Sequence, residues 1–124
     1  MPVLGSPTQA QEFLRVLIAP LDHEVFGLVH LDSRHRLIEV EQLFRGTVDG
    51  ATVHVREVIR SVLSHTSAAV LLFHNHPSGI AQPSAADEAI TQRVREPLAM
   101  IEVRVLDHLI VGDDVYSFAA RGLL

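Results

Sequence analysis

The segment that most constrains the fold is a run of six apolar residues at positions 68–73, AAVLLF. It is too short for a helix of its own, and a continuous apolar run of this length is typical of a strand covered on both faces. We therefore expect it to be the central strand of a sheet. The polar string HNHPSGIAQPS that follows predicts a long loop at the end of this strand.

The rest of the chain alternates between helical and strand patterns. Helical periodicity predicts three helices, at residues 8–18, 54–65 and 85–95. Four further strands are predicted at residues 24–32, 36–44, 100–111 and 115–118, with turns at residues 33–35 and 112–114 and a loop at residues 46–50. This order predicts an α/β fold, a three-layer α/β/α sandwich around a mixed sheet.

Two boundary residues carry specific expectations. Thr8 is the expected N-cap of the first helix, because its hydroxyl can accept a backbone hydrogen bond at the helix start. Pro97 follows Glu96 in the third helical segment, and a proline inside a helix kinks or ends it. We therefore expect the third helix to end before Pro97.

Composition excludes several classes of protein. The 124 residues fit a single domain, and the absence of cysteine excludes disulfides, a thiol nucleophile and thiolate metal sites. All ten basic residues are arginine and the net charge is −5, which argues against strong direct binding to nucleic acid. There is no apolar run of the ~18 residues that a membrane span needs and no signal-peptide pattern. We expect a cytoplasmic protein that does not contact membranes.

The chemistry of the chain is concentrated at the end of the central strand. His74 and His76 are two residues apart in an extended segment and therefore point to the same side. The loop after Pro77 can turn the chain back, so that a helix beginning near Ser84 brings Asp87 toward the two imidazoles. Two histidines and one carboxylate are a protein ligand set of catalytic zinc, with the fourth position left for water.

A simpler explanation stands beside this one. Paired histidines also occur on surfaces without metal, and Ser84 and Asp87 match a capping box, in which both would serve only the helix start. A carboxylate that coordinates zinc cannot also make its full set of capping hydrogen bonds at the start of its helix. Asn75 points to the side opposite the histidines and is expected to brace the loop, which Ser78 and Gly79 would shape.

These residues carry a resemblance to a known family. His74, His76, Ser84 and Asp87 match the pattern H-x-H-x7-S-x2-D of the JAMM (Jab/MPN-type) metalloproteases. The fuller string HNHPSGIAQPSAAD, with residues 44–47 and 107–112, resembles more narrowly the RadC branch of that superfamily. The resemblance implies a cytidine-deaminase-like fold and a single RadC-like JAB/MPN domain over residues 1–124. RadC proteins usually carry an N-terminal helix-hairpin-helix region, whereas this chain offers only the short helix at residues 8–18.

The resemblance also implies roles for individual residues. One zinc ion per chain would be held by His74, His76 and Asp87. Glu24, in an E-x2-G context with Gly27, would be the general base, and Ser84 would support the carbonyl oxygen during hydrolysis. The other candidates for the base are Glu39, Glu41 and Glu57, and the neighbours expected to support the ligands are Asp107 and His108. No motif surrounds the remaining histidines, which we interpret as surface or packing residues: His23, His30, His35, His54 and His65.

The sequence thus predicts a zinc-dependent hydrolase, a metallopeptidase or isopeptidase that cleaves an amide bond in a peptide or protein substrate. Two alternatives stay open: a RadC-type DNA-repair accessory protein that acts through partners, and a catalytically silent MPN-like interaction module. The complete motif disfavours the silent module, and the acidic balance disfavours direct contact with DNA. A homodimer is compatible with the sequence.

Overall fold

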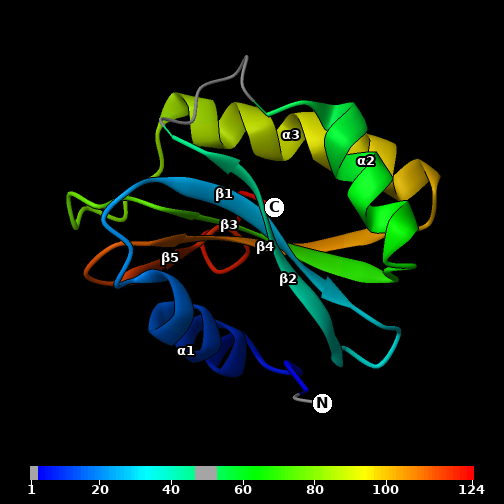
Figure 1. Ribbon diagram of the computed structural model, residues 1–124, viewed down its shortest axis with the longest axis horizontal. Coiled ribbons are helices and arrows are strands. Elements are labelled where there is room, and N and C mark those ends of the chain that lie inside the picture. The colour runs from blue at the N-terminus through cyan, green and yellow to red at the C-terminus, as the bar shows by residue number, and fades with distance from the viewer. Residues whose placement is uncertain (1–2, 47–52) are drawn as a thin grey trace.

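The computed structural model describes residues 3–46 and 53–124. Its helices are α1 (Pro7–Ile18), α2 (Val55–Ser64) and α3 (Ala85–Met100). Its strands are β1 (Val25–Leu31), β2 (Leu37–Arg45), β3 (Ala69–Asn75), β4 (Arg104–Val111) and β5 (Val115–Ser117). Helix α1 lies on one face of the sheet, and α2 and α3 lie on the other (Figure 1). The predicted three-layer α/β/α sandwich is therefore confirmed.

The sheet is mixed and has the strand order β2-β1-β3-β4-β5. Strands β1 and β2 form an antiparallel hairpin, β1 also pairs antiparallel with β3, and β3 pairs parallel with β4. All seven residues of β3 are buried, as the apolar run predicts for a central strand. Among the described residues, no helix combines the length and the apolar character needed to cross a bilayer.

Alternation along β1 and β3 divides the interior into two cores. Val29, Leu71 and Phe73 belong to the core that also contains Leu14 of α1. Their sequence neighbours point to the other face, where a second core joins the sheet to α2 and α3 through residues such as Leu28, Leu72, Val58 and Ile90. Because side chains alternate between the two faces of a strand, the even-numbered residues of β3 face α2 and α3.

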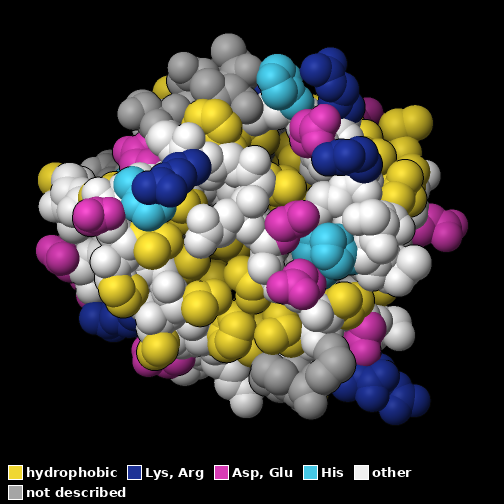
Figure 2. Space-filling model, viewed as in Figure 1, with side chains coloured by type: hydrophobic (Ala, Val, Ile, Leu, Met, Phe, Trp, Pro, Cys, Tyr) yellow, Lys and Arg dark blue, Asp and Glu magenta, His cyan; other side chains and the backbone are white. Residues whose placement is uncertain are grey.

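The face in Figure 2 displays few basic side chains, and these stand apart from one another with acidic side chains among them. Apolar side chains fill the middle of the same view. The described part of this face therefore offers no continuous basic surface of the kind that grips a phosphate backbone.

Several element boundaries differ from the prediction, and the differences at α1, α3 and β4 affect specific expectations. Helix α1 begins one residue earlier, and its N-cap is Ser6 rather than the expected Thr8, because the Ser6 hydroxyl accepts the backbone N–H of Gln9. Pro7 lies in the first turn, a position where a proline loses no helical hydrogen bond. Helix α3 continues through Pro97 to Met100, and β4 accordingly begins at Arg104. Burial of Val94 and Leu98 against the sheet holds this last turn of α3 in place. Of the predicted loop at residues 46–50, only Gly46 lies within the described residues.

Only glycine fits at position 27, because neighbouring atoms pack against it from two directions. A Cβ atom at this position would lie 2.2 Å from the backbone oxygen of Glu41 and 2.4 Å from the ring of Phe73. The register between β1 and β2 also shifts at the Phe26–Gly27 step. The glycine of the E-x2-G context therefore has a structural reason, namely the close approach of β2 and the Phe73 ring.

We predict that Gly27→Ala lowers the free energy of unfolding by about 1–3 kcal/mol, the usual range for an overpacked interior. Gly5→Ala is the matched control, because its Cβ would meet only Val3, at an ordinary 3.5 Å. Urea unfolding followed by circular dichroism measures both variants. Equal stability of the two variants would contradict this account of Gly27.

Candidate metal centre

His74 and His76 meet at the end of β3. His74 is the last even-numbered residue of the strand and is buried on the side of α3, and His76 lies on the same side in the following loop. Their rings are 4.9 Å apart and perpendicular. Together with Asp87 they form a group whose ligand atoms all lie within 4.8 Å of one another, close enough to hold one metal ion. The structure thus brings together the three residues that the spacing singled out.

Asp87 enters this group from the first turn of α3 and is fully buried. Its Oδ1 lies 2.9 Å from His74 Nδ1, and its Oδ2 lies 3.3 Å from His76 Nε2. The same Oδ2 accepts a hydrogen bond from the backbone N–H of Ser84 at 2.8 Å, and the Ser84 hydroxyl accepts one from the N–H of Asp87. The capping box is therefore present, and Asp87 combines it with contact to both imidazoles by using its two oxygens.

In each of the two histidines, Nδ1 makes a hydrogen bond and Nε2 stays available to a metal ion. His76 Nδ1 donates to the carbonyl of Ile80 at 2.7 Å, so its Nε2, which faces Asp87, carries the lone pair that a metal needs. His74 Nε2 is buried and has no hydrogen-bond partner among the described residues. A buried imidazole nitrogen without a partner is uncommon and fits a site for a cation.

The charges also fit a metal site. Burial raises the pKa of Asp87, but hydrogen bonds from His74 and His76 and from the Ser84 backbone outweigh burial, so its net pKa is well below the usual range. Asp87 is therefore ionised. The Asp87 carboxylate, which favours the protonated form of the neighbouring imidazole, raises the pKa of His76, although burial opposes this. A buried carboxylate that attracts nearby protons also attracts a metal cation.

Glu24 reaches the same group from the start of β1. Its Oε2 lies 3.6 Å from His74 Nε2, and its side chain is 28% exposed. Asn75 holds the backbone on both sides of Glu24: its Oδ1 accepts from the N–H of Val25 at 2.7 Å, and its Nδ2 donates to the carbonyl of His23 at 2.9 Å. Asn75 thus braces the segment that carries Glu24, rather than the loop that follows β3.

The three other candidate bases lie elsewhere. Glu41 contacts His30, Glu39 stands opposite His30 in the β1–β2 pairing, and Glu57 pairs with Arg60 on α2. Of the candidate glutamates, Glu24 contacts a histidine of the group formed by His74, His76 and Asp87.

Ser78 and Gly79 shape the loop between His76 and Ser84. The N–H of Gly79 donates to the carbonyl of His76, and the Ser78 hydroxyl accepts from the N–H of Ile80. Gly79 has a φ of +93°, a region that other residues rarely adopt, and a Cβ there would collide with Asp113. These contacts place the Ile80 carbonyl against His76.

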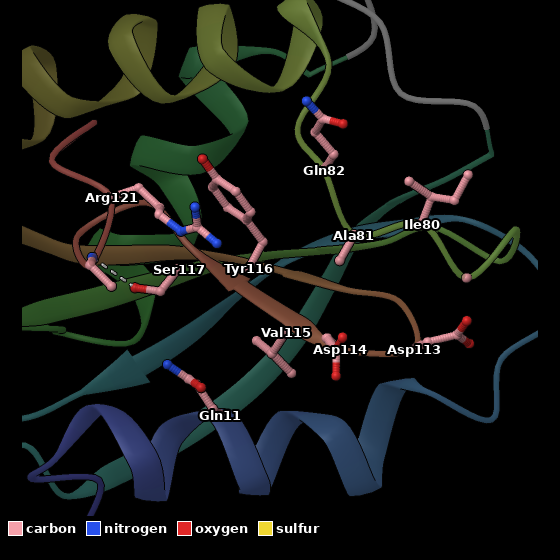
Figure 3. A pocket seen from close by; sticks show the side chains of 12 residues that line it. Gln11, Ile80, Ala81, Gln82, Asp113, Asp114, Val115, Tyr116, Ser117 and Arg121 are labelled. Carbon is pink, nitrogen blue, oxygen red and sulfur yellow. Dashed lines mark hydrogen bonds between the residues drawn. The ribbon is translucent and has the colours of Figure 1, made fainter.

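A pocket of about 630 Å³ adjoins this loop. Figure 3 shows its wall formed by residues 80–82 on one side and by β5 on the other, with Gln11 reaching in from α1. Tyr116 and Arg121 lie together in it, with the guanidinium 5.1 Å from the ring centre. The pocket lining does not include the metal-binding group, but Ile80 belongs to the pocket and hydrogen-bonds to His76.

Asp107 and His108 point to opposite faces of β4. Asp107 accepts hydrogen bonds from Ser117 and from the backbone of Ala119, so it fastens the turn after β5 and does not approach the histidine pair. His108 is fully buried, and burial lowers its pKa to about 3. Its Nδ1 meets Thr91 Oγ1 at 2.6 Å, and that hydroxyl donates to the backbone carbonyl of Asp87. Thr91, four residues after Asp87 on the same helix face, is a link that sequence reasoning did not identify.

Comparison with known proteins agrees with this architecture. A family model described as RadC-like JAB domain matches residues 4–123. A UPF0758 protein of Thioalkalivibrio sulfidiphilus is 55% identical over 121 residues, which cover 98% of this chain and 54% of that protein. A UPF0758 protein of Nitrosococcus oceani is 55% identical over 123 residues, which cover 98% and 55%. A UPF0758 protein of Vibrio cholerae is 51% identical over 113 residues, which cover 91% and 72%.

The chain spans about half the length of the first two of these relatives, and their names state no activity. The match of the family model over nearly all of the residues, together with identities above one half, establishes the relationship. The chain belongs to the RadC-like JAB domain family.

Proposed function

We propose that this chain is a zinc-dependent hydrolase that cleaves an amide bond, in a peptide or in an isopeptide linkage. The observation that carries the proposal is the convergence of His74, His76 and Asp87 with the Glu24 carboxylate, 3.6 Å from His74 Nε2. This places three candidate ligands beside a group that can accept a proton.

The donor set supports zinc as the metal. Two imidazoles and one carboxylate are the ligands of a common class of catalytic zinc site, which keeps one position open. A cation would satisfy two features of this structure: the Nε2 of His74, which has no hydrogen-bond partner among the described residues, and the ionised Asp87. A bound zinc ion supplies a Lewis acid that lowers the pKa of water toward neutrality.

Glu24 is suited to move the proton. An amide nitrogen leaves only after it is protonated, so one group has to take a proton from the attacking water and deliver it to that nitrogen. Glu24 combines contact with the buried group and a partly exposed side chain, which gives its carboxylate access to both water and substrate. Asn75 orders the backbone on both sides of it and acts as a positioning residue.

Ser84 is suited to stabilise the carbonyl oxygen as it becomes negative. Its Oγ accepts the N–H of Asp87 in the capping box, an interaction that uses a lone pair and leaves the hydroxyl hydrogen for donation. Helix capping and stabilisation of the oxyanion are therefore compatible for this residue. The position of Ser84 at the start of α3 places the hydroxyl beside Asp87.

The neighbouring pocket supports a peptide or protein as substrate. It is lined by amide, acidic and basic side chains as well as by apolar ones, and it borders β5, the edge strand of the sheet. An extended peptide can pair with an edge strand through its backbone. The loop at residues 79–82 would then lie between this part of the substrate and the scissile bond.

The first test is the zinc content of the purified chain. We expect His76→Ala to lose one equivalent of zinc relative to the parent, since a coordinating nitrogen is removed from a half-buried position. His54→Ala is the control, because His54 is exposed and makes no side-chain cap at α2. Metal analysis after gel filtration reads out both. Unchanged zinc in His76→Ala would refute this ligand assignment.

The second test separates the base from the ligands. Glu24→Gln preserves shape and removes basicity, so we expect hydrolysis to fall by ~10²–10⁴ while the zinc content is retained. A peptide-library screen supplies the cleavable substrate, and Glu57→Gln, an exposed glutamate on α2, is the control. Turnover by Glu24→Gln within a fewfold of the parent would exclude Glu24 as the base.

The third test concerns Asn75. Asn75→Ala removes both hydrogen bonds that flank Glu24, so we expect a lower kcat with zinc retained, and a loss of about 1–3 kcal/mol in unfolding free energy. Asn75→Asp keeps the acceptor for the Val25 N–H and loses the donor to His23, and its kcat is expected to fall between those of the parent and the alanine variant. A kcat equal to that of the parent in Asn75→Ala would show that the clamp does not position the base.

A further inference from the structure

A second convergent group of two histidines and a carboxylate lies at the other end of the sheet. His30 comes from β1, Glu41 from β2, and His65 directly follows α2. Their ligand atoms also lie within 4.8 Å of one another. In the β1–β3 pairing His30 stands opposite Val70, four residues before His74, a separation of about 13 Å along the strand. The two groups are therefore separate.

The two imidazoles are oriented by hydrogen bonds to their Nδ1 atoms. His65 Nδ1 donates to the carbonyl of Ser61 at 2.8 Å, which leaves the lone pair on Nε2. His30 Nδ1 meets the Ser67 hydroxyl at 2.6 Å, and its Nε2 faces Glu41 Oε1 at 3.4 Å. A hydrogen bond at one ring nitrogen fixes the orientation of metal-binding histidines, and in both of these rings Nδ1 makes that bond.

The side chains of this group also pack closely together. Burial, followed by the neighbouring His65, lowers the pKa of His30, which keeps this fully buried ring neutral. The rings of His30 and His65 stack 4.1 Å apart, within 17° of parallel, so the half-buried His65 ring has to turn out of this stack for both Nε2 lone pairs to reach one ion. Burial raises the pKa of Glu41, but hydrogen bonds from Ser61 and His30 outweigh burial, and the net shift is downward. A carboxylate and a neutral imidazole thus face one another.

We propose that His30, Glu41 and His65 form a second metal site, which binds a divalent transition-metal ion of the zinc class. Nitrogen and carboxylate oxygen donors in this number suit zinc and its neighbours in the first transition row. The hydroxyl of Ser61, 3.0 Å from His30 Nε2 and hydrogen-bonded to Glu41, or a water molecule would complete the coordination. The ion would join the β1–β2 hairpin to the end of α2, a structural role that does not depend on the proposed hydrolase activity.

The experiment measures zinc binding by calorimetry and metal analysis in the full 124-residue chain. The variants are His65→Ala, Glu41→Gln, His76→Ala and the double variant His65→Ala/His76→Ala, with the exposed His54→Ala as the control. His65 is half-buried and Glu41 35% exposed, so these substitutions avoid the buried His30. Glu41→Gln also retains an oxygen that can accept from Ser61. Circular dichroism verifies that each variant is folded.

We expect His65→Ala to lose one equivalent of zinc in both the parent and the His76→Ala background, and Glu41→Gln to weaken that equivalent at least about tenfold. Zinc should also raise the Tm of His76→Ala by several degrees, and of the double variant not at all. The proposal is overturned if folded His65→Ala and Glu41→Gln bind as much zinc as His54→Ala. If only His76→Ala loses zinc, the site at His74, His76 and Asp87 is supported and the second site is refuted. If only His65→Ala loses zinc, the second site is supported and the first is refuted.

Discussion

Burial of the end of β3 is the constraint on which the rest of the site depends. This strand is buried along its whole length, yet its last two residues are His74 and Asn75, whose polar atoms require partners inside the protein. His74 finds one in Asp87, which ties the start of α3 to the strand. Asn75 finds two in the backbone around Glu24, which ties the start of β1 to the same place. The polar side chains at the end of β3 thus need partners from other elements, and their hydrogen bonds bring together residues of β3, α3 and β1.

The predictions from sequence succeeded where local periodicity controls the structure. The apolar run marked β3, and alternation placed His74 and His76 on one side and Asn75 on the other. The capping box at Ser84 and Asp87 was also visible, since it depends on residues three apart. Helix α3 continues through Pro97 because burial of its side chains stabilises the last turn more than the low helix propensity of proline destabilises it.

Contacts between distant segments were beyond the reach of sequence patterns. Glu24 was selected through the family resemblance, because nothing in the spacing relates it to His74. The partners of Asn75 and the link through Thr91 depend on how β1, α3 and β4 pack. His30, Glu41 and His65 were assigned other roles, and only the β1–β2 register and the end of α2 bring them together.

The three candidate ligands lie close together along the chain, whereas Glu24 is far from them in sequence. His74, His76 and Asp87 fall within 14 consecutive residues, because 13 positions separate the first from the last. The hydrogen bond from Val25 to Asn75 spans 50 positions, and it requires the β1–β3 pairing to be complete. Contacts of long sequence separation carry the larger entropy of loop closure. A folding chain would therefore gather its three candidate ligands before Glu24 reaches them, because the position of Glu24 depends on the later β1–β3 pairing.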